Sequence, residues 1–272
     1  MAANRRRGLS RAVAAVVVVG LLFAAGLGVR ALWRHLTEIS AHGCTFGTSS
    51  LTTNQASVAS SMVGVVMHRS LPHRAAVLTI AAGLQESKLT NLAPGQGDRD
   101  SVGVLQQRPS QGWGTEKQLS DVHYATERFL DALVKVDGWQ ALPLADAIQE
   151  VQRSADGSAY AKHEDDATAI VAGFWGRPRG ITCSFGKPDK AAPPATVAAQ
   201  LRRDLPVRAP AVSGRDIRVP GASWPTVAWL VANADRLGLE SVTYDGWHWT
   251  RSGKWHKASP TDEDVHATVA ET

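Results

Sequence analysis

The sequence predicts a mainly α-helical protein, in which a helical domain follows an N-terminal membrane helix and precedes a small C-terminal α+β module. Three observations predict this class. An uncharged apolar run occupies residues 12–29, helical periodicity recurs between the two cysteines, and the hairpin signal Asp245-Gly246 lies near the C-terminus. The expected divisions are a basic cytoplasmic segment (1–11), the membrane helix (12–33), the helical domain (44–185), a Pro/Ala-rich linker (186–217), the small module (218–258) and a tail (259–272).

The N-terminus has the pattern of a signal anchor. Four arginines, at positions 5, 6, 7 and 11, precede the apolar run. A helix of this length, at about 1.5 Å per residue, spans roughly the hydrocarbon core of a bilayer. Because basic residues ahead of a span stay in the cytoplasm, we expect the rest of the chain outside the cell membrane. The run exceeds the usual signal-peptide core of about 7–15 residues, although a cleaved signal peptide and a secreted protein are the alternative.

The cysteine content agrees with export. Cys44 and Cys183 are the two cysteines of the chain. In an oxidising compartment they most simply form one disulfide, which would stabilise the fold by about 4–5 kcal/mol. They are too few for a thiolate metal site, and the nine histidines show no ligand-like spacing, so we expect no metal and no cofactor. The net charge of +4 suits an anionic cell envelope and includes no clustered patch for nucleic acid.

The segment between the cysteines is predicted to be helical. Apolar residues follow the helical period in residues 52–69, "HRAAVLTIAAGLQ" is apolar on nearly every side, and "VHYATERFLDALVKV", "LADAIQEVQRSA" and "ATAIVAGFW" continue the pattern. The stretch Gly103 to Gln106 is the one candidate strand. The segment therefore predicts a single-core helical domain.

Glu86 is the residue in this domain with the clearest chemical role. It stands at or near the C-terminal end of the buried helix. Burial disfavours the charged carboxylate, and the negative end of the helix dipole disfavours it further. Both effects raise the pKa, and a protonated carboxylic acid in a cleft is the general acid that glycosidic cleavage requires. An exposed helix-end glutamate is the alternative interpretation.

Two motifs in order resemble a known superfamily. Glu86-Ser87, followed by Gly103-Val104-Leu105-Gln106, resembles the "ES … GLMQ" signature of lysozyme-like lytic transglycosylases. The stretch "GDRDSVGVLQ" at 97–106 is similar to the "GD-x-G-N-x-x-G-L-M-Q" stretch of goose-type lysozymes. The resemblance covers about residues 55–163. It implies a lysozyme-like fold that acts on peptidoglycan, with Glu86 as the catalytic acid.

The resemblance also implies roles for other residues. Asp98 matches the second carboxylate: across the cleft it would permit inverting hydrolysis, and otherwise Glu86 alone would give a 1,6-anhydro product. Turn chemistry is the alternative for Asp98. The residues expected to bind substrate are Ser87, Ser101, Gln106, Gln107, Trp113, Gln152 and Tyr160. Ser87 is also expected to help hold Glu86. The alternatives are a core amide for Gln106, a buried side chain that closes a loop for Trp113, and packing for Tyr160. Two departures leave activity open: Arg108 replaces an Asp of goose-type enzymes, and "EVQRSA" replaces "A-Y-N-A-G", so that Gln152 or Ser154 must supply the polar contacts.

The C-terminal residues predict a helix followed by a hairpin. They carry five of the nine tryptophans, which could bind glycan or form the core of a small module. The leading functional hypothesis is a membrane-tethered peptidoglycan-cleaving enzyme. The alternatives are a lysozyme-like scaffold that binds glycan or an envelope assembly without cutting, and a pure tether for a secretion or conjugation machine. An envelope secretion or cell-wall assembly partner is a further expectation.

Overall fold

The described residues form a mixed α+β structure. The computed structural model describes residues 42–154, 157–259 and 263–271. Within them are eight α-helices and two antiparallel sheets, one of them six-stranded. The prediction of a mainly α-helical protein with one small α+β module is therefore wrong. The strands that it missed are three to five residues long, which is too short for a clear alternating pattern.

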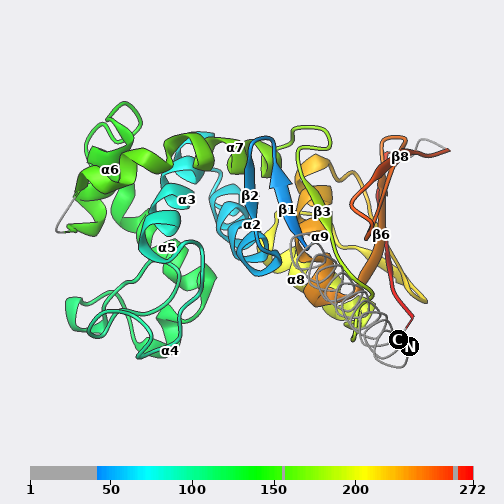
Figure 1. Ribbon diagram of the computed structural model, residues 1–272, viewed down its shortest axis with the longest axis horizontal. Coiled ribbons are helices and arrows are strands. Elements are labelled where there is room, and N and C mark those ends of the chain that lie inside the picture. The colour runs from blue at the N-terminus through cyan, green and yellow to red at the C-terminus, as the bar shows by residue number, and fades with distance from the viewer. Residues whose placement is uncertain (1–41, 155–156, 260–262, 272) are drawn as a thin grey trace, which may run out of the picture. The chain divides into compact units, whose positions relative to one another are not determined.

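The N-terminal part is mainly helical, and α2 lies between its other helices and α8 (Pro194–Asp204) and α9 (Trp224–Leu237) (Figure 1). Its helices are α2 (Thr53–His68), α3 (His73–Ser87), α4 (Glu116–Leu119), α5 (Val122–Leu133), α6 (Leu144–Gln152) and α7 (Glu164–Phe174), with 3-10 turns η1 (Pro109–Gln111) and η2 (Gly157–His163). The periodicity of the sequence correctly predicted these α-helices, apart from α4. The candidate strand at Gly103 to Gln106 is instead a turn.

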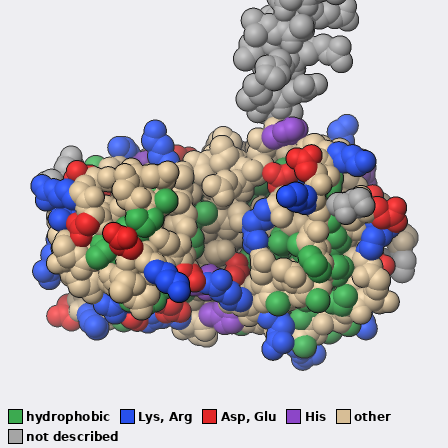
Figure 2. All heavy atoms as spheres, turned by 90° about the horizontal axis from the view of Figure 1, so that it is seen from below, with side chains coloured by type: hydrophobic (Ala, Val, Ile, Leu, Met, Phe, Trp, Pro, Cys, Tyr) green, Lys and Arg blue, Asp and Glu red, His purple; other side chains and the backbone are tan. Residues whose placement is uncertain are grey.

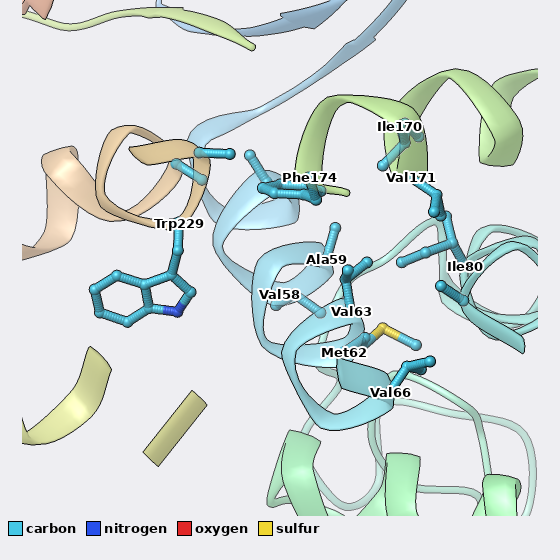
Figure 3. Close-up of a cluster of buried hydrophobic side chains, with 14 of the residues drawn as sticks. Val58, Ala59, Met62, Val63, Val66, Ile80, Ile170, Val171, Phe174 and Trp229 are labelled. Atoms are coloured by element: carbon cyan, nitrogen blue, oxygen red, sulfur yellow. The ribbon is translucent and has the colours of Figure 1, made fainter. Parts of the chain in front are cut away.

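Helix α2 lies at the centre of the core because it is buried on several sides. Figure 3 shows Trp229 on one side of α2, and Ile80 and Val171 on the other. Small residues allow this close packing: a Cβ on Gly64 would lie 2.1 Å from the backbone oxygen of Asp204. The C-terminal helices thus pack directly on α2.

A small sheet closes the helical part. It has the strand order β2–β1–β3, formed by β1 (Gly43–Phe46), β2 (Ser49–Leu51) and β3 (Thr182–Ser184). Cys44 and Cys183 are directly opposite in the register of β1 and β3, and they form a disulfide with a Cα–Cα distance of 4.0 Å. The predicted bridge is confirmed.

The C-terminal part is a six-stranded sheet packed on helices. The order β4–β5–β9–β6–β7–β8 combines β4 (Ala211–Ser213), β5 (Asp216–Val219), β6 (Leu239–Tyr244), β7 (Trp247–Thr250), β8 (Trp255–Lys257) and β9 (Val265–Val269). Helices α8 (Pro194–Asp204) and α9 (Trp224–Leu237) complete this part. The expected linker at 186–217 contains α8 and β4, and the expected tail at 259–272 contains β9, which lies between β5 and β6. Residues 43–272 cluster as one unit.

The tryptophans of this part are used mainly in packing. Trp229 and Trp249 are 1% and 0% exposed, and the Trp249 indole donates to the backbone oxygen of Cys183 at 3.0 Å. The rings of Trp224 and Trp255 meet edge to face at 5.8 Å. The predicted Asp245-Gly246 hairpin is confirmed, since Tyr244 pairs with Trp247 across it. These contacts agree with the core interpretation of the tryptophans.

Charges of both signs mix on the surface. Figure 2 shows Lys and Arg side chains interspersed with Asp and Glu on one face. None of the helices in the described ranges is long and apolar enough to cross a membrane, and the predicted membrane helix at 12–33 lies outside those ranges.

Candidate active site

Glu86 sits in the last turn of α3, and the end of this helix is held firmly. Lys88 and Leu89 both adopt the left-handed conformation, with φ of 55° and 57°. The Leu89 amide donates to the Gly83 oxygen at 2.9 Å, which satisfies a carbonyl that the helix leaves open. The Gln55 side chain donates to the Lys88 oxygen at 2.6 Å. The backbone at the end of α3, which carries Glu86, is therefore held in place.

Two side chains from other segments contact the Glu86 carboxyl group. The Tyr160 hydroxyl, from η2, donates to Glu86 Oε1 at 2.5 Å. Gln152, at the end of α6, also hydrogen-bonds Glu86. Ser154 hydrogen-bonds Tyr160 in turn. Gln152 and Ser154 thus make polar contacts around Glu86, as expected of one or the other, and Tyr160, which was expected to line the cleft wall or to pack, binds the Glu86 carboxyl group.

Burial sets the protonation of this carboxyl group. Burial raises the pKa of Glu86 above its ordinary value, and it outweighs the hydrogen bonds from Tyr160 and Gln152, which favour the charged form. Burial also raises the pKa of Tyr160, as does its bond to Glu86. Glu86 therefore keeps its proton to a higher pH than an exposed glutamate does.

The motif turn after Glu86 is tied to α3. The Ser87 hydroxyl donates to the Val104 oxygen at 2.7 Å. Gly103 has φ of 79°, and a Cβ there would lie 2.3 Å from the Leu119 oxygen, so glycine is required. Gln152 Nε2 donates to the Leu105 oxygen at 3.0 Å, which joins this turn to α6.

The other motif residues mainly stabilise the turn itself. Gln106 Nε2 donates to the Gly103 oxygen at 2.8 Å, so this side chain folds back on its own turn. Gln107 is 2% exposed, and its Nε2 donates to the Ala125 oxygen at 3.0 Å. Ser101 is 8% exposed. The substrate contacts expected of these three residues stay predictions.

Asp98 lies on an exposed turn. Its side chain is 91% exposed, and its nearest charged partner is Arg99, at 3.8 Å. Arg108, which stands where goose-type enzymes have an acid, binds Asp100 at 2.6 Å. Hydrogen bonds from Ser110 and Arg108 hold the pKa of Asp100 well below its ordinary value. Arg108 thus fixes the loop, and Glu86 has no carboxylate among the groups that shift its pKa.

A groove of about 920 Å³ lies beside this cluster. Its walls are the segment around Trp113, the end of α5 and the end of α6. The lining residues are Gln111, Gly112, Trp113, Arg128, Asp131, Ala132, Lys135, Val136, Asp137, Leu142, Glu150, Val151, Gln152 and Arg153. Gln152 connects the groove to Glu86, because its side chain hydrogen-bonds Glu86 and Gln152 also lines the groove. Glu86, Asp98 and Gln106 are not among these residues, and the charged α5 and α6 positions were missed because they carry no motif.

A buried carboxylate, Asp204, lies where α8 meets α2. Asp204 is 5% exposed. It accepts hydrogen bonds from Ser61 at 2.6 Å and from the Trp229 indole at 2.8 Å, and it bonds His123 Nε2 at 2.7 Å. Burial raises its pKa, but these three partners outweigh burial and the pKa is lowered. Asp204 therefore stays ionised inside the fold.

The comparisons leave the family open. Across the described ranges, no group of three or more His, Cys, Asp or Glu side chains could hold a metal ion. No protein-family model matches the chain, and no curated protein matches it. The lysozyme-like resemblance therefore rests on the motifs around Glu86 and Gln106.

Proposed function

We propose that this protein cleaves the β-1,4 glycosidic bonds of peptidoglycan, with Glu86 as the general acid. The observation that carries the proposal is the state of Glu86: a carboxyl group at a fixed helix end, with a raised pKa and a tyrosine hydroxyl 2.5 Å away. An acid that keeps its proton to a higher pH than an exposed glutamate is suited to protonate a leaving sugar oxygen. The resemblance to lytic transglycosylases and goose-type lysozymes supplies the substrate class.

The surroundings of Glu86 favour a mechanism with one carboxylate. The proton of Glu86 passes to the glycosidic oxygen as the bond to the anomeric carbon breaks. The Glu86 carboxylate then accepts the proton of the muramic 6-hydroxyl as that oxygen bonds to the anomeric carbon. The product is a 1,6-anhydro sugar, and Glu86 is protonated again. The exposed position of Asp98 supports this path over hydrolysis assisted by a second acid.

The disulfide between Cys44 and Cys183 supports an extracytoplasmic location. Tethering to the cell membrane through residues 12–33 is part of the proposal, with a secreted form as the alternative. The second candidate function is a scaffold that binds glycan or an envelope assembly without cutting. One observation favours it: Tyr160 and Gln152 already engage the Glu86 carboxyl group.

The deciding experiment is a digestion. The full-length protein is incubated with purified peptidoglycan, and the soluble products are identified by mass. Products ending in 1,6-anhydromuramic acid are expected. Products with a free reducing end would instead indicate hydrolysis. Glycan that binds the protein and stays intact would favour the scaffold.

A further inference from the structure

We infer that a groove lined by α2 and by the C-terminal ends of α8 and α9 binds a polyol or sugar that carries a phosphodiester group. The groove measures about 490 Å³, within the range of roughly 300–1,000 Å³ found for ligand clefts. The segment from α4 to the start of α5 forms its remaining wall. It shares no residue with the groove beside Glu86, so this site is separate from the proposed cleavage of glycan.

The two described acids that line this groove are already bound by the protein. Arg203 Nη2 donates to both oxygens of Asp121, at 2.8 and 2.7 Å, and the His123 amide donates to Asp121 at 2.9 Å. Asp204 has three hydrogen-bonding side chains around it, and its pKa is lowered. Both carboxylates therefore have internal partners, and no ligand is needed to satisfy them.

Arg236, near the end of α9, is held in place by neutral groups. Its Nε donates to Ser57 Oγ at 2.9 Å and to Asn233 Oδ1 at 2.7 Å. Its Nη1 donates to Gln200 Oε1 at 2.5 Å. These contacts fix the guanidinium group without neutralising its charge.

The groove has an excess of positive charge. Its Lys117, Arg203 and Arg236 outnumber its two acids by one. Neither Lys117 nor Arg236 forms an ion pair with an acid in the described part of the chain. Asp235, the neighbour of Arg236 in sequence, binds Arg251 at 3.0 Å. The groove therefore favours a ligand with one negative charge.

The contacts of Arg236 favour a phosphodiester, which carries one negative charge, over a carboxylate. A carboxylate typically binds a guanidinium group through two parallel hydrogen bonds. Ser57 and Asn233 occupy the Nε side of Arg236, which closes one such fork, and Gln200 occupies Nη1. Lys117 is a point charge on a different element, α4. Cations on two elements can contact separate oxygens of a tetrahedral phosphate.

The hydroxyl groups of the groove favour a ligand that also has alcohol groups. Three serines line the groove, and each donates its proton within the protein. Ser57 donates to an amide oxygen at 2.7 Å, Ser61 to a carboxylate oxygen at 2.6 Å and Ser120 to a backbone oxygen at 2.8 Å. A hydroxyl oxygen has two lone pairs, so these serines can accept hydrogen bonds from a ligand. The alcohol groups of a polyol or sugar are suitable donors.

Calorimetric titration of the full-length protein tests the site with three probes. Glycerophosphoglycerol has a phosphodiester between alcohol groups, dimethyl phosphate lacks the alcohols, and gluconate has a carboxylate in place of the phosphodiester. At equal ionic strength, the Kd of glycerophosphoglycerol should be about tenfold or more below the Kd of either other probe.

Matched variants locate the binding in this groove. Lys117→Gln/Arg236→Gln should raise the Kd of glycerophosphoglycerol about tenfold or more. Lys117→Gln alone should raise it about threefold, and this exposed side chain can be changed while the contacts of Arg236 stay intact. The control Lys190→Gln/Lys254→Gln removes the same charge from exposed positions outside the groove and should keep the wild-type Kd.

Absent binding of glycerophosphoglycerol at about 10 mM, or one Kd for the wild type and both groove variants, would overturn the site. Equally tight binding of either other probe would overturn the assignment to a polyol phosphodiester. A lipid headgroup and a soluble polymer share this chemistry, so a competition distinguishes them. Displacement of the probe by phosphatidylglycerol vesicles, but not by phosphatidylcholine vesicles, supports a lipid headgroup. Displacement by soluble poly(glycerol phosphate) supports a polymer.

Discussion

Glu86 is half-buried and Asp204 is buried, and the pKa values of these two carboxyl groups move in opposite directions. Glu86 is hydrogen-bonded by Tyr160 and Gln152, and burial raises its pKa. Asp204 has three partners, one of them the imidazole of His123, and its pKa is lowered. The number and charge of the partners therefore decide which acid keeps its proton. One carboxyl group is suited to proton transfer, and the other is suited to joining α8 to α2 and α9.

The largest expected effect separates the two acids by activity. Glu86→Gln keeps the shape of the side chain and removes the transferable proton. Peptidoglycan cleavage should fall by about 100-fold or more, the range typical of general acid catalysis, while the circular dichroism spectrum is unchanged. Asp98→Asn is the matched control, because its exposed side chain is expected to leave the rate close to wild type. A Glu86→Gln protein that cuts at the normal rate would refute the assignment.

The next prediction compares the two carboxyl groups by their contribution to the free energy of unfolding. Asp204→Ala leaves Ser61, Trp229 and His123 without their shared acceptor, and the free energy of unfolding should fall by about 3 kcal/mol. Urea denaturation monitored by tryptophan fluorescence measures the loss. Asp204→Asn keeps part of the hydrogen bonding and should lose less. A loss under about 1 kcal/mol for the alanine variant would contradict a structural role for this cluster.

The helices could be predicted from the sequence because their apolar pattern repeats over many residues. The buried run of α3 and the amphipathic pattern of α5 are both strong signals. The three-stranded sheet and most strands of the six-stranded sheet could not be predicted in this way. Strand β9 has the alternating sequence "VHATV", but five residues in a presumed tail gave too weak a signal. Strands β1 and β3 are three or four residues long, and their pairing depends on the ends of a domain meeting.

The candidate site shows the same limit. Motif resemblance identified Glu86, because Ser87 and Val104 are close enough in sequence to form one signature. The contact between Tyr160 and Glu86 spans 74 residues, and that between Ser61 and Asp204 spans 143. Contacts over such separations have no local pattern. The Asp204 cluster was missed entirely for this reason.

The third effect tests how Tyr160 adjusts Glu86. The Tyr160 hydroxyl favours the charged form of Glu86, so Tyr160→Phe should raise the pKa of Glu86 further. The alkaline limb of the pH–rate profile should move to higher pH, because the reaction needs protonated Glu86. The rate at the optimum should also fall about tenfold, the cost of one hydrogen bond to an ionisable group. A rate loss with an unmoved alkaline limb would indicate that Tyr160 only packs.

The smallest effect is on the pH dependence of stability, and it has opposite signs for the two acids. The folded pKa of Glu86 is raised above its ordinary value of 4.5, so the folded state binds more protons than the unfolded state as pH rises through that window. The contribution of Glu86 to stability is therefore full below pH 4.5, and it is lost as pH rises through the raised pKa of the folded state. The folded pKa of Asp204 is lowered below 3.8, so its contribution to stability is full above pH 3.8 and is lost as pH falls.

Denaturation of wild type, Glu86→Gln and Asp204→Asn across this pH range measures both effects. Relative to wild type, the free energy of unfolding of Glu86→Gln should increase as pH rises. That of Asp204→Asn should increase relative to wild type as pH falls. Parallel curves for all three proteins would mean that neither carboxyl group has a pKa shifted by folding.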